Sequence, residues 1–94
     1  VRYWDRGATK NDGDYTAGVL MGFSGGFYYV MDVVRGQWPD DERDRMIRQT
    51  AALDRQTFGD VQIWEEREGG SAGKDAGRAF VKMLAGYPAF TESM

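Results

Sequence analysis

The sequence predicts an α/β domain in which a mixed sheet is flanked by helices, and three observations support this fold class. Strand-like segments open the chain and include a glycine-turn hairpin, which predicts a three-stranded antiparallel meander. A helical segment then leads to a fourth strand, and a crossover can place that strand parallel to the first. A second helix and the start of a last strand follow. With 94 residues, the chain is expected to form one domain, residues 1–94, around a single modest core.

The three strands of the meander are predicted at residues 2–5, 15–23 and 27–34. Tyr, Thr, Val, Leu, Met and Phe dominate these segments, as is typical of strands. Gly25 and Gly26 predict the hairpin turn, because glycine readily adopts the positive φ of tight turns. We expect the aromatic residues of the strands to form part of the sheet core: Tyr3, Trp4, Phe27, Tyr28, Tyr29 and Trp64.

The first helix is predicted to begin at Pro39 and to end at Gly59. Proline suits the first helical turn, and the acidic residues 40–42 lie where the helix dipole favours anions. The residues that recur at helical spacing predict its buried face: Met46, Ile47, Thr50, Leu53 and Thr57.

The second half of the chain predicts a strand at residues 61–66, a glycine-rich loop at 68–73 and a helix at 74–85. Gly86 is expected to end this helix, and a last strand is expected to begin near residue 87. The helix face expected to be buried carries Ala76, Phe80, Met83 and Leu84.

The composition excludes several classes of site. The chain has no cysteine and no histidine, which removes thiol and imidazole catalysis and ordinary zinc sites. A hard, oxygen-binding cation is the metal that best fits the remaining side chains. The net charge of −3 means that contact with nucleic acid would need a local basic patch or a metal bridge. No apolar run is long enough to span a bilayer, so no membrane association is expected.

Acidic residues at the expected strand ends form the main candidate site. If the first and fourth strands are parallel neighbours, Asp5 comes close to Glu66, and such carboxylates repel unless a cation lies between them. Mg²⁺ or Mn²⁺ is the natural ion. Side-chain alternation separates Glu65 from Glu66 without choosing between them, and the alternative for each acid is a solvated strand end or a salt bridge to arginine. Glu68, Asp14 and Asp32 complete the acidic set.

Other motifs carry weaker signals. Asp75 follows Gly73-Lys74 where a phosphate-binding loop needs Ser or Thr, so that motif fails. The acidic turn at residues 11–14 fails the calcium-loop pattern. Candidates for a phosphate-contacting rim, which scattered surface charge explains equally well, are Arg6, Lys10, Lys74 and Arg78.

Taken together, five motifs resemble a known family. They are Tyr-Trp-Asp-Arg at residues 3–6, Gly-Asp-Tyr-Thr-Ala-Gly at 13–18, and Tyr-Val-Met-Asp-Val-Val-Arg-Gly at 29–36. Ile-Trp-Glu-Glu-Arg-Glu at 63–68 and Gly-Ser-Ala-Gly-Lys at 70–74 follow. In order and spacing, this set is similar to the C-terminal nuclease domain of the terminase large subunits of tailed phages and prophages.

The resemblance implies an RNase H-like fold and an endonuclease that depends on Mg²⁺ or Mn²⁺. Such a domain cuts concatemeric double-stranded DNA during genome packaging in the cytoplasm of the bacterial host, alongside the terminase small subunit and the portal. The family's first-strand acid falls on Asp5, and the acid that ends its fourth strand falls on Glu66, with Glu68 as a fallback. Asp14 matches an auxiliary metal contact.

Two departures from the family define the alternatives. The family's third catalytic acid lies further along than Met94, and its ATPase domain precedes the nuclease. The resemblance therefore implies a partial nuclease domain with an incomplete two-metal site, and leaves its activity open. The alternative is a non-catalytic prophage remnant that acts as an oligomerising or interaction module, which predicts a homodimer and no effect of divalent ions. A nucleotide-binding kinase half has no motif support.

Overall fold

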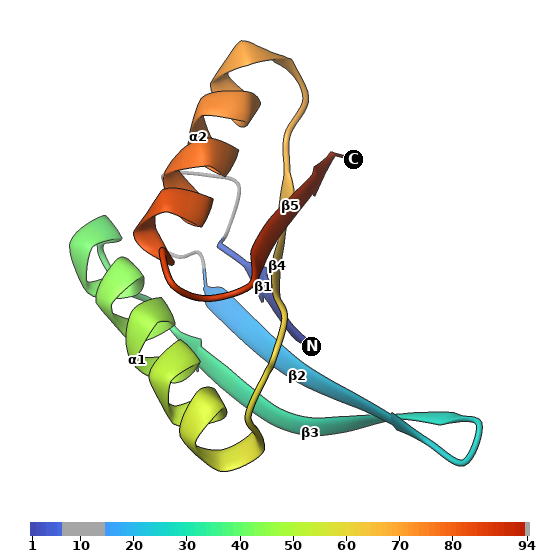
Figure 1. Cartoon of the computed structure of the whole chain (residues 1–94). Coiled ribbons are helices and arrows are strands. Elements are labelled where there is room, and N and C mark those ends of the chain that lie inside the picture. Colours follow the sequence, from blue (N-terminus) through green and yellow to red (C-terminus); the bar gives the residue numbers. More distant parts are fainter. Residues whose placement is uncertain (7–14, 94) are drawn as a thin grey trace.

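The computed structural model describes residues 1–6 and 15–93, which form a five-stranded mixed sheet and two helices (Figure 1). The strand order is β3-β2-β1-β4-β5. The first three strands, β1 (Arg2–Asp5), β2 (Thr16–Ser24) and β3 (Phe27–Gly36), pair antiparallel. The last two, β4 (Ile63–Arg67) and β5 (Ala89–Ser93), run parallel to β1. The predicted α/β class, the meander and the parallel fourth strand are therefore confirmed.

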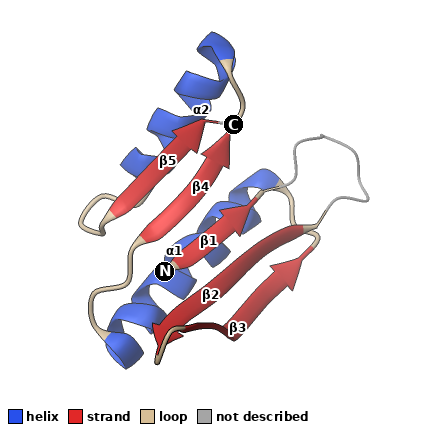
Figure 2. Ribbon diagram, turned by 90° about the vertical axis from the view of Figure 1, so that its right-hand side faces the viewer, coloured by secondary structure: helices blue, strands red, loops and turns tan. Residues whose placement is uncertain are grey.

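Both helices, α1 (Asp40–Phe58) and α2 (Gly70–Met83), pack on the same face of the sheet (Figure 2). The carboxyl ends of β1, β4 and β5 point to one edge, at the top of that view. No described element covers the opposite face, which we call the open face. Neither helix of the described chain is both long and apolar enough to cross a membrane.

The core lies between the sheet and the helices. Trp4 and Ile63 from the sheet contact a buried cluster from the helices that includes Ile47 and Phe80. Gly18 lies opposite Trp4 on β2, and a Cβ atom at position 18 would come within 2.7 Å of the indole ring. Glycine at this position therefore lets the largest core side chain lie flat against the neighbouring strand.

The second helix begins earlier than predicted. Residues 70–73, expected to be part of a loop, form the first turn of α2, and Gly69 precedes it without a side-chain cap. Gly73 is buried, and a Cβ atom there would collide with the backbone carbonyl of Glu68. The glycines that suggested a loop instead allow this turn to pack closely against the end of β4.

The buried faces of the helices also differ from the prediction. Leu53 and Thr57 of α1 are exposed, and Asp54 is buried in their place. Phe80 of α2 and Leu84, which caps its carboxyl end, are buried as expected, but Ala76 is exposed and Gly77 is buried. A charged residue occupies the inner face of α1 because it meets a buried arginine of β1.

That arginine is Arg2, and it joins α1 to three strands. Its Nε and Nη2 atoms donate to the Asp54 carboxylate at 2.9 and 2.7 Å, and Nη1 donates to the carbonyl of Gly18 at 3.0 Å. Nη2 also contacts Asp32 of β3 at 3.0 Å. Burial by itself would lower the pKa of Arg2. The hydrogen bonds and charges of Asp54 and Asp32 outweigh this effect, so the pKa lies above its ordinary value. Arg2 therefore stays charged.

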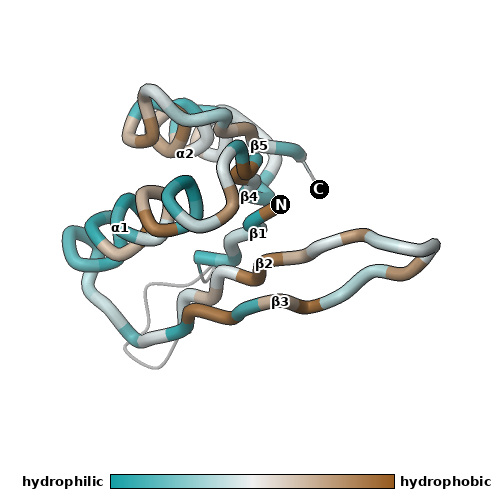
Figure 3. Tube along the Cα trace, turned by 60° about the horizontal axis from the view of Figure 1, so that its bottom comes forward, coloured by the Kyte–Doolittle hydropathy of each residue, from teal (hydrophilic) through white to brown (hydrophobic). Residues whose placement is uncertain are grey.

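The aromatic residues of the hairpin contradict the prediction that they form the sheet core. Phe27, Tyr28 and Tyr29 are 67%, 75% and 51% exposed. The β2–β3 hairpin extends beyond the helices, so neither of its faces is covered near the turn (Figure 3). Gly25 and Gly26 form the turn with positive φ, as predicted. The prediction is confirmed for Trp4, whereas Tyr3 and Trp64 lie outside the buried core, and Trp64 stacks on Phe90 with ring centroids 4.8 Å apart.

Candidate functional site

Asp5 and Glu66 lie on the open face at the carboxyl ends of two neighbouring parallel strands. The register pairs Trp4 with Glu65, so its continuation by one residue sets Asp5 opposite Glu66. Since side chains alternate along a strand, both acids face away from the helices that cover Trp4 and Glu65. Both are exposed. The register thus brings together the two acids that the sequence singled out.

A third acid, Glu92 of β5, lies next to this pair and was missed by the sequence analysis. We call Asp5, Glu66 and Glu92 the acidic row. Glu92 pairs with Glu66 in the parallel register of β4 and β5. The hydroxyl of Tyr3 donates a 2.7 Å hydrogen bond to Glu92 Oε1 across β4. Extending the predicted last strand past Phe90 would have identified it, because a parallel fifth strand places its own carboxyl end beside that of β4.

The negative charge of the acidic row affects the pKa of Tyr3. Burial, together with the hydrogen bond and charge of Glu92, raises the pKa of Tyr3 well above its ordinary value. The charges of Glu66 and Glu65 act in the same direction. The phenol therefore remains a hydrogen-bond donor at neutral pH and holds the Glu92 carboxylate in place.

The donor chemistry of Asp5 and Glu66 fits a hard divalent cation. Adjacent strands lie about 4.8 Å apart, and facing carboxylates at this spacing repel unless a cation lies between them. Mg²⁺ is commonly held by one or two carboxylates and several waters. Within residues 1–6 and 15–93, no three acidic side chains are arranged as a metal-binding group. The candidate site therefore consists of the pair Asp5 and Glu66, and Asp14, the predicted auxiliary contact, lies outside the described residues.

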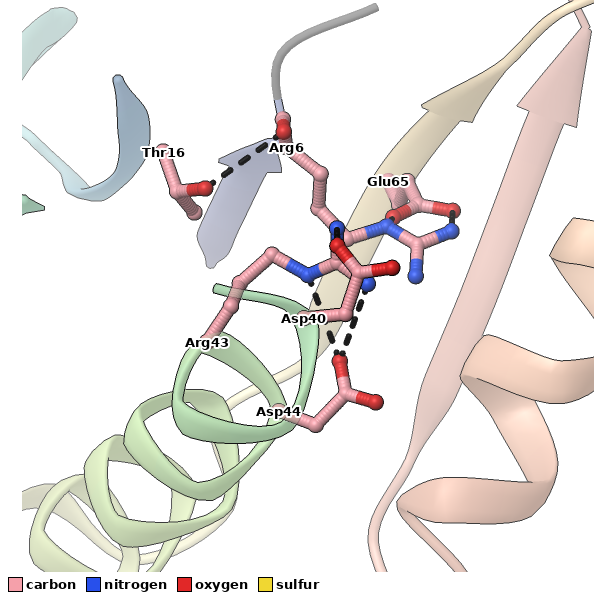
Figure 4. A network of polar contacts seen from close by, with 6 residues as sticks. All are labelled: Arg6, Thr16, Asp40, Arg43, Asp44 and Glu65. Carbon is pink, nitrogen blue, oxygen red and sulfur yellow. Dashed lines mark hydrogen bonds and ion pairs between the residues drawn. The ribbon is translucent and has the colours of Figure 1, made fainter. Parts of the chain in front are cut away.

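Glu65 is on the other face, beneath the helices, and its side chain is only 3% exposed. Arg6 Nη2 donates to Glu65 Oε1 at 2.7 Å, and Arg6 Nε forms an ion pair with Oε2. This pair lies beside the first turn of α1, where Arg43 contacts Asp40 and Asp44 (Figure 4). Burial raises the pKa of Glu65 to about 7, although Arg6 opposes the shift. Glu65 is thus a buried partner of Arg6, turned away from Asp5.

Two further acids from the sequence analysis lie apart from the Asp5–Glu66 pair. Asp32 pairs with Leu20 in the β2–β3 register and contacts Arg2, so it belongs to the interface with α1. Glu68 is exposed in the short link between β4 and α2, beyond the strand pairing that aligns Glu66 with Asp5.

The residues predicted to form a basic rim lie in two separate places. Arg6 is engaged with Glu65, and Lys10 lies outside the described residues. Lys74 and Arg78 line a groove beside α2, away from Arg6.

Comparisons of the chain with protein-family models, with curated proteins and with solved structures give no match.

Proposed function

We propose that this chain is an RNase H-like nuclease domain that uses a divalent metal ion, related to the terminase large subunits that its motifs resemble. The observation that carries the proposal is the placement of Asp5 and Glu66 on one face at the ends of adjacent parallel strands. The strand order β3-β2-β1-β4-β5, with an antiparallel meander and two parallel strands, supports the finer fold assignment.

In this proposal, Asp5 and Glu66 hold Mg²⁺ or Mn²⁺ at the edge of the sheet, and Tyr3 positions Glu92 beside them. When bound, such an ion activates water and stabilises the leaving oxygen in phosphodiester cleavage. Glu65 does not take part, because Arg6 neutralises it on the covered face. The substrate is double-stranded DNA in the host cytoplasm, with the terminase small subunit and the portal as partners in packaging.

The test is a calorimetric titration with Mn²⁺ and Mg²⁺, together with a plasmid-nicking assay. We expect Asp5→Asn and Glu66→Gln to abolish or weaken ion binding at least about tenfold, because each removes one of two charged ligands. Glu68→Gln removes the same charge two residues further on, and we expect it to bind like the wild type. Circular dichroism checks that each variant is folded.

The outcomes separate binding from activity. Ion binding that is unchanged in both Asp5→Asn and Glu66→Gln would sink the proposed metal site. Loss of binding in Glu68→Gln instead would move the second ligand to the fallback position. Nicking that needs the ion and both acids would establish the nuclease, whereas binding without nicking would limit the proposal to a metal-binding fold.

A second candidate, an oligomerising module without catalysis, is favoured by the exposed hairpin. Val30, Met31 and Val33 of β3 are each at least half exposed, and β3 is an edge strand of the described sheet. A second copy of this chain is the occupant that fits, because an unpaired strand edge can pair with its own copy in antiparallel fashion. This candidate predicts a dimer whose formation does not respond to divalent ions.

A further inference from the structure

A basic groove of about 590 Å³ lies between α2 and the outer strands β4 and β5. Arg67 enters it from the carboxyl end of β4, and Lys74, Arg78 and Lys82 line it from α2. Among the described residues, those that line the groove include no carboxylate. Four of the 12 basic residues of an acidic chain are therefore gathered in one groove.

The three cations of α2 form a row along the helix. Lys74, Arg78 and Lys82 are spaced four residues apart, so they project from one side at intervals of about 6 Å. Like charges at this spacing repel one another along the helix, and of the three cations it is Lys82, in the last turn, that the helix dipole favours. Helix stability therefore does not account for the row, whereas a ligand with repeated negative charges would.

The groove keeps its positive charge despite a nearby acid. Asp75 contacts Arg78 at 3.0 Å, but both side chains are 76% exposed. Exposed pairs of this kind contribute little, and either partner can move to another contact.

Gly77 forms part of the groove between the helix and the strands. A Cβ atom at position 77 would lie 2.8 Å from Arg67 Cδ and 3.2 Å from Thr91 Oγ1. Glycine therefore lets α2 approach β4 and β5 closely, and it leaves the side chain of Arg67 room to reach the groove. The groove is therefore positively charged, with glycine at its base.

We propose that this groove binds the phosphodiester backbone of a nucleic acid through Arg67, Lys74, Arg78 and Lys82. A regular row of cations in an open groove suits successive phosphates better than a single phosphate group. It also supplies the local basic patch that a chain of net charge −3 needs to bind nucleic acid. The inference rests on the groove and not on the nuclease chemistry, so it requires no metal ion.

The experiment measures binding of a short fluorescein-labelled DNA duplex to the full chain by fluorescence anisotropy, in EDTA and over a range of salt concentrations. We expect Lys74→Gln/Lys82→Gln to weaken binding about tenfold or more at low salt. Losing two phosphate contacts should also reduce the slope of log K against log salt by about 1.8, at about 0.9 per contact on a duplex. The same measurement with a labelled single strand shows whether the groove binds double-stranded or single-stranded DNA.

The matched control is Arg45→Gln/Arg48→Gln, which removes two charges from exposed positions of α1. It should bind DNA nearly as well as the wild type. Equal losses in the two double variants would overturn the proposal, because net charge would then explain binding. Absence of binding to both labelled DNAs at low salt would also overturn it. Binding measured in EDTA does not depend on a bound ion, so failure of the metal site and failure of the groove are distinguishable.

Discussion

Glu65 and Glu66 are neighbours in the chain with opposite surroundings. Alternation along β4 turns Glu65 under the helices toward Arg6 and leaves Glu66 on the open face. The sequence predicts that the two side chains point to opposite faces, but not which face the helices cover. That choice depends on the packing of α1 and α2, which brings Arg43 and Asp44 near Glu65.

The raised pKa of Glu65 predicts an unusual pH dependence of stability. Its pKa is about 7 in the fold against an ordinary value of 4.5. Between these values the folded protein binds a proton that the unfolded chain does not, so the free energy of unfolding falls as pH rises from about 4.5 to about 7. The contribution lost is on the order of 3 kcal/mol, at about 1.36 kcal/mol per unit.

Urea unfolding at pH 5, 6, 7 and 8 measures this effect. The chain has no histidine, so few other groups titrate in this interval. Glu65→Gln should flatten the dependence, since the amide does not ionise and its oxygen can still accept from Arg6. Equal pH profiles for the variant and the wild type would show that Glu65 ionises normally.

At the scale of elements, the docking of α1 depends on the buried pair of Arg2 and Asp54. Asp54→Ala leaves the Arg2 guanidinium buried with only partial compensation, and we expect a loss of about 3 kcal/mol in the free energy of unfolding. Asp32→Ala is the matched control, because Asp32 contacts the same Nη2 atom but its side chain is 52% exposed. It should cost about 1 kcal/mol or less. Equal losses in chemical denaturation would argue against a special role for the buried pair.

The elements themselves were largely predictable because their signals are local. Pro39, the acids after it and Gly59 marked the ends of α1, and the glycine pair marked the hairpin turn. The inner face of α1 was not predictable, since Asp54 is buried only because Arg2 is buried opposite it. Likewise, Gly73 was predicted to lie in a loop, because its close approach to the Glu68 carbonyl depends on how α2 packs after β4.

The candidate site was likewise predictable where it depends on local signals and strand order, and not where it depends on packing. Parallel pairing of the first and fourth strands could be predicted from the crossover, and it brought Asp5 to Glu66. Glu92 could not be assigned to the site because it depends on the length and direction of β5, of which only the start was predicted. Strand alternation also turns Arg67 away from Glu66, so consecutive residues of β4 supply the basic groove and the acidic row at one edge.

For the molecule as a whole, the described helices lie on one face of the sheet and leave the open face without a covering element in the described chain (Figure 2). Trp64 and Phe90 stack there, and the β2–β3 hairpin extends the exposed surface beyond the helices. Apolar side chains gathered on an exposed surface are a common feature of sites where proteins associate. In the described sheet, β3 is an edge strand of ten residues, and one side of it pairs with no other described strand.

These features predict that the chain forms a dimer through β3, with a mass in solution that rises with concentration to twice that of the monomer. Val30→Lys places a charge on the exposed part of the hairpin and should shift the protein to monomer, because charged residues on edge strands oppose strand pairing. Leu53→Lys, at an exposed apolar position of α1, controls for a general gain in solubility and should dimerise like the wild type.

Sedimentation velocity or light scattering distinguishes the monomer from the dimer. A wild-type chain that stays monomeric up to its solubility limit would contradict the dimer, as would equal dissociation of the two lysine variants. A dimer that responds to Mn²⁺ only when Asp5 and Glu66 are intact would instead tie assembly to the acidic edge.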